Sequence, residues 1–311
     1  MSMVNDIQKL LSERADLEAR IKASAFDGSI EVKTISGQKY IYVRKREAGK
    51  YKSTFVDKFS EELYALAVNQ AQQLRAVKKQ LRRVERDLAK LGYEGSELSS
   101  RVRLNIDFAR ANVKSLIYDQ AVLEGVSTTF PQTETILENG EISGVKPSDV
   151  QKILNLKHAW EFVVDPNVVA SPCNFYSLSY IAKLVNEGFY ENGGEVRGVP
   201  ITIGGSTYMP PIPIEANVKE QIGGILDSDL EGIDVAVELV LYCMKSQVFI
   251  DGNKRAAIIF ANLYMIKQGL GLLVVPESVV PEFRELLVGY YEGRDETAVK
   301  KFLKEKCWRK F

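Results

Sequence analysis

The chain has 311 residues, 45% of them hydrophobic, and its 41 Lys and Arg residues balance 41 Asp and Glu residues. That size suits one large domain or two modest ones, and no apolar run reaches the ~18 residues of a membrane-spanning helix. Three dispersed cysteines, a single histidine and the lack of an N-terminal signal-peptide core argue against disulfides, structural zinc and secretion, so they favour a cytoplasmic protein.

The charge is distributed unevenly along the chain. Residues 1–95 hold 19 Lys and Arg against 13 Asp and Glu, a net charge of +6, so the remainder carries −6. Residues 92–100 are rich in Gly, Glu and Ser, as linkers often are. These features predict a boundary there, with a first region at 1–95 and a second at 100–311.

The hydrophobic pattern of the first region predicts two helices and a small sheet. Apolar residues recur at helical spacing over 7–25 and 59–91, and these helices are expected to pack antiparallel as a hairpin. Between them, residues 29–35, 38–44 and 51–56 have the pattern of strands and are separated by glycine-containing turns. The prediction is a helical hairpin with a short antiparallel β meander.

Basic and aromatic residues share this first region. Arg44-Lys-Arg46 lies near Tyr40, Tyr42 and Tyr51, and basic residues recur along the second predicted helix. Two interpretations stay open. One is a surface that binds nucleic acid or a partner protein; the other is a solvated helix face beside a stabilising meander, since +6 is a modest charge for a nucleic-acid-binding domain.

The second region is expected to be mainly helical. Helical patterns cover residues 104–117, 150–163, 177–187, 235–244, 256–266, 281–291 and 296–306. Residues 197–211 differ, because two short β-prone runs flank Gly204-Gly205 and predict a β-hairpin. His158, on the helix at 150–163, is expected to have a structural role.

The loop that follows Gln247 carries the strongest chemical signal. Asp251-Gly-Asn-Lys-Arg255 opens a helix, where free backbone N–H groups face an anion and Gly252 lets the chain approach it closely. Lys254 and Arg255 add positive charge, and Asp251 can hold Mg²⁺ against phosphate oxygens. For these residues alone, an ordinary Asp- or Asn-capped helix start is the alternative.

The wider segment, residues 247–259, resembles the Fic (Fido) family signature, His-x-Phe-x-Asp/Glu-Gly-Asn-Gly/Lys-Arg. The matching residues are Phe249, Asp251, Gly252, Asn253, Lys254 and Arg255. Two positions depart from the family pattern. Gln247 replaces the histidine, and Ile258 stands where a second arginine often follows.

A second resemblance lies upstream, in residues 115–129. Glu124-Gly125 resembles the end of the Fic inhibitory-helix motif, although Gln120 replaces its Ser or Thr. In the family, this glutamate pairs with the second arginine and blocks the nucleotide's γ-phosphate. Because position 258 is isoleucine, the resemblance leaves Lys254 and Arg255 as the substitute partners of Glu124.

The predicted hairpin at 197–211 resembles the Fic flap. It has a Gly-x-x-Arg lead-in, a turn at Ile203-Gly204 and Tyr208 before two prolines. In the family, the flap pairs with the backbone of a protein target and presents its hydroxyl to the nucleotide. The resemblance covers roughly residues 100–306 and implies a Fic-type helical bundle, with Tyr290 and Tyr291 near the adenine.

The resemblance implies transfer of AMP from ATP, with Mg²⁺, to a Ser, Thr or Tyr hydroxyl of a protein target. Asp251 would hold the metal, and residues 252–255 would bind the phosphates, with Arg255 also assisting catalysis. Gln247 cannot serve as the general base, because an amide does not accept a proton near neutral pH. Loss of a base typically costs about 10²–10⁴-fold in rate, so we expect nucleotide binding with impaired or lost catalysis.

Other functions stay open on the sequence. In one, the Fic-like part is a scaffold and the basic region at 1–95 gives a non-catalytic regulatory protein that binds nucleic acid or a partner. In another, the protein transfers phosphate like the related phage addiction-module toxin. Gln247 weakens this hypothesis as much as it weakens AMP transfer, because the motif histidine is missing for both reactions. A homo-oligomer is compatible with all of them.

Overall fold

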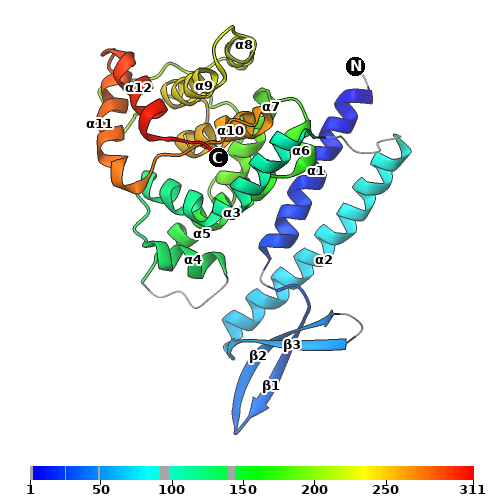
Figure 1. Ribbon diagram of the computed structural model, residues 1–311. Coiled ribbons are helices and arrows are strands. Elements are labelled where there is room, and N and C mark those ends of the chain that lie inside the picture. Colours follow the sequence, from blue (N-terminus) through cyan, green and yellow to red (C-terminus); the bar gives the residue numbers. More distant parts are fainter. Residues whose placement is uncertain (1–2, 25, 48–49, 92–97, 139–143) are drawn as a thin grey trace. The chain divides into compact units, whose positions relative to one another are not determined.

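The computed structural model describes residues 3–24, 26–47, 50–91, 98–138 and 144–311 (Figure 1). The chain divides into two compact units, Met1–Glu94 and Gly95–Phe311. The expected boundary at 92–100 and the turn between the second and third strands fall mostly outside the described residues. Within the described ranges, no helix combines the length and the apolarity needed to cross a membrane.

The first unit is a pair of helices joined through a small sheet. Its elements are α1 (Met3–Ala23), β1 (Ser29–Ile35), β2 (Gln38–Glu47), β3 (Lys50–Lys58) and α2 (Glu61–Lys90). The strands form an antiparallel meander in the order β1-β2-β3, and α1 runs antiparallel to α2 (Figure 1). The predicted helical hairpin and meander are confirmed.

Two apolar clusters stabilise this unit. Leu11 and Leu17 of α1 pack against Val84 and Leu88 of α2. A second cluster joins one face of the sheet to α2, through Phe26, Val43, Ala67 and Ala71. Because side chains alternate along a strand, the opposite face of the sheet points away from this cluster.

The second unit is a helical bundle. Its helices are α3 (Ser100–Leu123), α4 (Phe130–Leu137), α5 (Pro147–Val163), α6 (Pro166–Ala170), α7 (Phe175–Val185), α8 (Glu215–Leu226), α9 (Gly232–Ser246), α10 (Asn253–Gln268), α11 (Val280–Tyr291) and α12 (Glu296–Lys306). A 3₁₀ turn, η1 (Glu277–Val279), precedes α11, and β4 (Leu272–Leu273) pairs with β5 (Trp308–Arg309). The mainly helical fold with small antiparallel sheets is confirmed.

Helix α10 lies at the centre of this bundle. Every residue from 255 to 266 is buried, and the helix contacts α9, α7, α3 and α5. A helix that is apolar on all sides must be covered on all sides. The chain therefore holds the N-terminus of α10, where the loop after Gln247 ends, in a fixed position.

Two helices, α6 and α8, were not expected from the sequence. Each buries only a few apolar side chains: Val168 and Val169 in α6, and Val218 and Ile222 in α8. So few buried positions cannot establish a helical period.

The flap segment, 197–211, turns as expected but does not form the two predicted strands. Ser206 N–H donates to the Ile203 carbonyl at 3.2 Å, and Gly205 has a left-handed φ of 81°. No strand is assigned between these ends. The physical reason is twofold: the prolines at 200, 210 and 211 have no N–H for a ladder, and the Arg197 side chain binds carbonyls on both sides of the turn.

Candidate functional site

The loop between α9 and α10 is closed by one asparagine side chain. Asn253 Oδ1 accepts the Phe249 N–H at 2.9 Å, and its Nδ2 donates to the Phe249 carbonyl at 2.8 Å and to Gln247 Oε1 at 3.1 Å. Phe249, only 1% exposed, anchors the loop in the core. Both hydrogens of the Asn253 side-chain amide are therefore used inside the loop. The backbone N–H of Asn253, at the start of α10, is the donor that this residue could offer to a ligand.

Gly252 forms the floor of the predicted cradle. It has a left-handed φ of 72°, and a Cβ there would lie 2.7 Å from Asn186 Oδ1. Gly252 is also the N-cap of α10, and no side chain caps the helix. The first N–H groups of α10 therefore lack an intrahelical acceptor and form a site suited to an anion.

Asn186 supports the loop from the end of α7. Its Nδ2 donates to the Asp251 carbonyl at 2.9 Å and to the Gly193 carbonyl at 3.0 Å, and the residue is fully buried. The sequence pattern does not predict this contact. The only local signal was an asparagine at a helix end, which most often reports a cap.

Arg197 connects the motif loop to the flap. Its Nε donates to the Gln247 carbonyl at 2.6 Å, and its Nη atoms donate to the carbonyls of Val199, Pro210 and Pro211 at 2.7, 3.2 and 2.7 Å. The residue is 4% exposed, and burial lowers the pKa of its guanidinium below the ordinary arginine value. From the sequence, Arg197 is predicted only as part of the lead-in to the flap. Its bonds to the motif loop and to both ends of the flap are not predicted.

Gln247 lies at the end of α9 with both ends of its side chain bonded. It adopts a left-handed conformation (φ 46°), its Nε2 donates to the Met244 carbonyl at 2.7 Å, and its Oε1 accepts from Asn253. This amide shapes the loop. It offers no group that takes a proton from a hydroxyl.

The basic residues of the loop meet two carboxylates. Arg255 is 2% exposed; its Nη2 donates to Asp251 Oδ2 at 2.9 Å, and its Nη1 donates to the Val185 carbonyl at 2.7 Å. Glu124, at the end of α3, brings one carboxylate oxygen to 3.4 Å from Arg255 Nε and the other to 3.7 Å from Lys254 Nζ. Glu124 thus lies at the N-terminus of α10, between the two residues that the sequence left as its partners.

The contact between Glu124 and Arg255 is not a complete hydrogen bond. Within the described part of the chain, Glu124 Oε1 and Arg255 Nε are buried and have no hydrogen-bond partner. A buried donor of this kind is costly unless a ligand or another group satisfies it. The neighbouring Gly125, with a φ of 78°, ends the helix that carries Glu124.

Gln120 fixes α3 to α10 one turn before Glu124. Its Nε2 donates to the Arg255 carbonyl at 2.8 Å, and its Oε1 accepts from Trp160 Nε1 at 3.0 Å. Ile258, at the position of the second arginine, is 3% exposed and belongs to the core. Gln120 and Ile258, which both depart from the family motifs, are therefore accommodated by buried hydrogen bonds and by packing, respectively.

Asp251 is the one residue of the loop suited to hold a metal. Its side chain is 48% exposed, and one of its oxygens bonds Arg255 while Oδ1 has no such bond. Across the described residues, no group of three His, Cys, Asp or Glu side chains could bind a metal on its own. Mg²⁺ is commonly held by one or two carboxylates together with phosphate oxygens, so the residues fit the metal as part of a nucleotide complex.

The flap is held against α11 by specific contacts. Glu292 Oε1 accepts the Thr207 N–H at 3.2 Å and the Ser206 hydroxyl at 3.3 Å. The Tyr208 ring stacks on the Tyr291 ring with centroids 6.5 Å apart. The Thr207 N–H is the main cause that lowers the pKa of Glu292 below its usual value.

Two tyrosines end α11 beside this flap: Tyr291 is buried and Tyr290 is half-buried. Burial raises the pKa of Tyr290 to about 12. Burial also raises the pKa of Tyr291, and the negative charge of Glu124 adds to the effect. Tyr291 thus contacts Tyr208 of the flap and lies within reach of the charge of Glu124.

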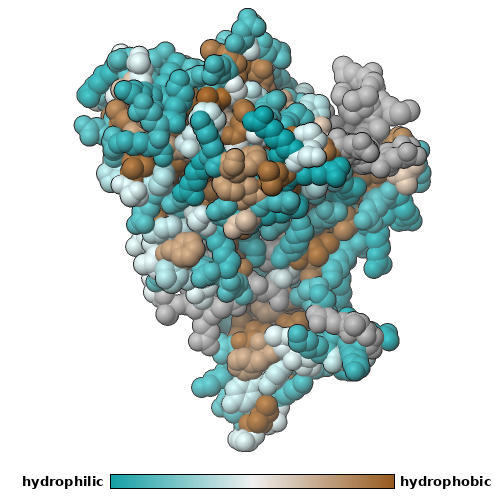
Figure 2. Space-filling view, viewed as in Figure 1, coloured by the Kyte–Doolittle hydropathy of each residue, from teal (hydrophilic) through white to brown (hydrophobic). Residues whose placement is uncertain are grey.

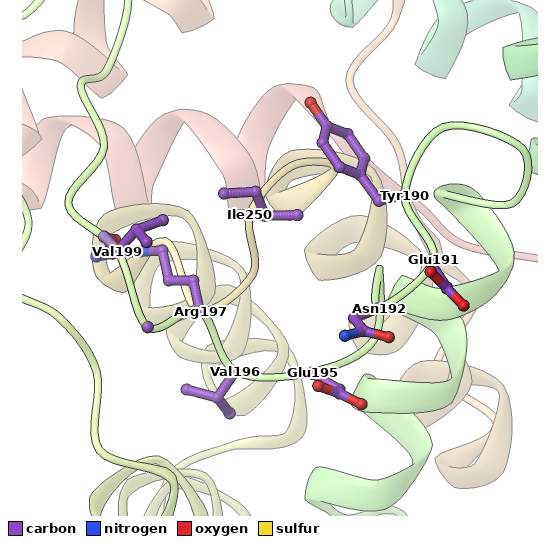
Figure 3. Close-up of a pocket in the computed structure, with 9 residues that line it drawn as sticks. Tyr190, Glu191, Asn192, Glu195, Val196, Arg197, Val199 and Ile250 are labelled. Atoms are coloured by element: carbon purple, nitrogen blue, oxygen red, sulfur yellow. Dashed lines mark hydrogen bonds between the residues drawn. The ribbon is translucent and has the colours of Figure 1, made fainter.

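A pocket of about 300 Å³ opens beside the motif loop (Figure 3). Its lining residues are Tyr190, Glu191, Asn192, Glu195, Val196, Arg197, Gly198, Val199 and Ile250. Figure 3 shows Tyr190 and Ile250 on one side and the carboxylates of Glu191 and Glu195 on another. The lining also includes the Arg197 guanidinium, so this pocket combines two carboxylates with one cation.

His158 lies away from this loop. It is 5% exposed on α5, and its Nδ1 is 3.2 Å from Glu187 Oε2. The three cysteines are free. None of these side chains reaches the N-terminus of α10.

These contacts define a helical protein in which a loop with unbonded N–H groups joins α9 to α10. Residues 175–265 match the family model described as Fic/DOC family, so the chain contains a Fic domain. That segment includes the flap, the motif loop and most of α10. No curated protein matches the chain.

Solved structures share the fold at low sequence identity. Fic-1 (residues 134–508) of C. elegans has a TM-score of 0.53 and 17% identity, over 79% of this chain and 73% of that one. A Fic domain containing signaling protein from Bacteroides thetaiotaomicron VPI-5482 also has a TM-score of 0.53, with 16% identity over 64% and 82% of the two chains. A Fic family protein from Desulfovibrio desulfuricans G20 has a TM-score of 0.52, with 16% identity over 70% and 65%. At this identity, the likeness concerns the fold.

Proposed function

We propose that this Fic-domain protein binds ATP with Mg²⁺ and has an impaired or lost capacity to transfer AMP to a protein hydroxyl. Members of the family commonly transfer a nucleoside monophosphate to proteins. The observation that carries the proposal is the combination of an uncapped α10 N-terminus with a Gln247 amide that is fully bonded inside the loop. The uncapped helix start favours phosphate binding. The amide at position 247 leaves the site without a general base for AMP transfer.

The phosphate cradle is supported by backbone and charge. The N–H groups at 253–255 begin α10 without a side-chain cap, Lys254 lies at their edge, and the buried Arg255 Nε has no hydrogen-bond partner among the described atoms. The helix dipole adds a partial positive charge at the same point. A phosphate chain would satisfy these donors, and its charge would replace that of Glu124.

Asp251 supplies the ligand for Mg²⁺ in this proposal. Arg255 Nη2 donates to Asp251 Oδ2 at 2.9 Å and so restrains the carboxylate, and the other oxygen would bind the metal. The metal would neutralise charge on the phosphate oxygens. Because the protein offers one carboxylate to Mg²⁺, binding of the metal would depend on the bound nucleotide.

Transfer itself would be slow, because no base is in place. The Gln247 amide hydrogen-bonds the Met244 carbonyl and Asn253, and it does not accept a proton near neutral pH. His158 is on α5 beside Glu187 and does not replace it. Positioning and electrostatics account for much of phosphoryl-transfer catalysis, so a weak activity is compatible with the remaining residues.

Glu124 would restrain nucleotide binding. Its carboxylate lies within 3.7 Å of Lys254 Nζ and 3.4 Å of Arg255 Nε, where it competes with phosphate for the same cations. This contact would replace the pairing with a second arginine, which Ile258 cannot make.

The flap would guide a protein target. Its residues Ile203, Gly204 and Tyr208 would contact the backbone of the target, and the pocket lined by Tyr190 and Ile250 would accept a neighbouring side chain.

The direct test is calorimetric titration of the full chain with ATP and Mg²⁺. We expect saturable binding that is lost in Asp251→Ala and kept in Asp227→Ala, which removes an exposed carboxylate at the end of α8. Absence of binding to the unmodified chain would refute the proposal. Equal binding by both variants would show that the nucleotide occupies another site.

A further inference from the structure

The outer face of the β1-β2-β3 sheet presents rings and positive charges, and the Fic site accounts for none of them. Register and alternation place the odd residues of β1, the even residues of β2 and Tyr51, Ser53 and Phe55 of β3 on this face. The other face packs on α2 through Val43 and its neighbours. We call the first surface the outer sheet face. Apolar side chains are visible on the surface of the sheet region at the lower end of Figure 2.

Aromatic rings cover the middle of the outer sheet face. The Phe55 ring lies 6.0 Å from that of Tyr40 and 5.7 Å from that of Tyr42, measured between centroids. Phe55 is 51% exposed, and Tyr51, further along β3, is 64% exposed. Rings held in place by their neighbours while keeping free surface are suited to stack with planar groups of a ligand.

Positive charges alternate with these rings. Lys33 Nζ lies 4.6 Å from the centroid of the Tyr42 ring, and the Arg44 guanidinium lies 4.1 Å from that of Tyr51. Arg46 lies 5.9 Å from the same Tyr51 ring. One carboxylate, Glu31, opposes these cations among the described side chains of this face, with contacts of 2.9 Å to Arg44 and 3.9 Å to Lys33. The described part of this face thus carries three cations, Lys33, Arg44 and Arg46, and the carboxylate of Glu31.

We propose that the outer sheet face binds single-stranded nucleic acid. Unpaired bases stack on exposed rings, and a polyphosphate backbone is complementary to Lys33, Arg44 and Arg46. In a duplex, the bases are already stacked on one another and cannot reach Phe55 and Tyr51. A protein partner is less well matched, because protein interfaces have an apolar centre with few charges, whereas here cations lie directly over the rings. This activity is independent of the nucleotide site.

The test measures fluorescence anisotropy of a labelled oligothymidylate of about 15 nucleotides with the full chain. We expect binding that weakens with salt, with a log–log slope of about −2 if three phosphates are neutralised. Phe55→Ala is expected to weaken binding about tenfold through the loss of stacking, and Phe55→Trp is expected to retain it. Because Phe55 is half exposed, circular dichroism should show an unchanged fold in both variants.

Two double variants distinguish binding at the outer sheet face from binding through positive charge elsewhere on the same unit. Lys33→Gln with Arg46→Gln should reduce the salt slope to about −0.7. Lys79→Gln with Arg82→Gln removes the same charge from exposed positions of α2 and should leave the slope near −2. Failure to bind the oligothymidylate, equal effects of the two double variants, or tighter binding of a duplex of the same length would each overturn the proposal.

Discussion

Arg197 Nε donates a hydrogen bond to the backbone carbonyl of Gln247 at 2.6 Å, and the rest of its guanidinium binds carbonyls at both ends of the flap. The backbone N–H of Arg197 also donates to the Val248 carbonyl, at 3.0 Å. In a β-hairpin, a backbone ladder would join the two ends of the flap. That ladder is absent here, and the Arg197 side chain joins these ends to each other and to the motif loop.

Replacement of Arg197 by Met should destabilise the chain and release the flap. The change leaves several buried carbonyls without a donor, so we expect a loss of about 3 kcal/mol in the free energy of unfolding. Urea unfolding measures the loss, and hydrogen exchange of residues 199–208 measures release of the flap. Arg110→Met is the control, because Arg110 makes one hydrogen bond, to the Val164 carbonyl at 3.1 Å; equal losses would contradict the anchoring role.

Replacement of Gln247 by His should restore a base without disturbing the backbone. Histidine is among the residues that tolerate the left-handed conformation found there (φ 46°). The expected result is unchanged ATP affinity with transfer of label from α-labelled ATP to protein raised by about 10²–10⁴-fold. Gln247→Ala, which opens the same space without a base, should show no gain. Equal activity in the two variants would contradict the assignment of this position.

Replacement of Glu124 by Gly or Ala should strengthen nucleotide binding. It removes a negative charge that lies 3.7 Å from Lys254 Nζ and 3.4 Å from Arg255 Nε, so we expect a Kd for ATP with Mg²⁺ about tenfold lower. Glu134→Ala, which removes a carboxylate that pairs with Lys114 on the same unit, is the control. An unchanged Kd in Glu124→Gly would exclude an inhibitory role for Glu124.

Replacement of Gly252 by Ala should damage the cradle. The left-handed φ of 72° costs an alanine about 1–2 kcal/mol, and the new Cβ would lie 2.7 Å from Asn186 Oδ1. We therefore expect a lower unfolding free energy together with loss of ATP binding. Gly204→Ala is the matched control, since a Cβ there meets no atom within 4 Å. A Gly252→Ala chain that binds ATP normally would contradict the role of the left-handed Gly252 in shaping the cradle.

The contact between Glu292 and Thr207 should make the flap sensitive to acid. In the folded chain, the pKa of Glu292 is lowered below its ordinary value, mainly through the Thr207 N–H. A lowered folded pKa means that the contact stabilises the flap above the unfolded pKa and is lost as pH falls through the folded value. Hydrogen exchange of Thr207, measured from neutral pH downward, should show this loss, while Glu292→Gln should give pH-independent protection after correction for intrinsic exchange.

The sequence was informative wherever neighbours along the chain determine structure. The apolar runs around the motif predicted α9 and α10, and Gly252 and Asp251 marked the cradle because the helix start depends on adjacent residues. The meander was predicted from its alternation and its glycine turns. In the flap, the same local reasoning failed, because the prolines and the Arg197 side chain changed the backbone bonding.

The contacts that the sequence could not supply join residues far apart along the chain. Gln120 bonds the carbonyl of Arg255 across 135 positions, and Glu292 bonds Thr207 across 85. Asn186 contacts the Asp251 carbonyl across 65 positions. Each is an ordinary polar residue at a helix end or on a helix face, and only the fold identifies its partner.

Gln120 also determines how Glu124 could leave the cradle. The bonds from Gln120 to the Arg255 carbonyl and from Trp160 to Gln120 fix α3 one turn before Glu124, so the helix cannot slide away unless buried polar groups are exposed. Departure of the carboxylate is then a rotation about side-chain torsions at a stationary helix end. In the proposed function, an incoming phosphate would displace the Glu124 carboxylate without movement of α3. The fraction of chains in which Glu124 is displaced would then rise gradually with nucleotide concentration, and no second protein would be needed to move the helix.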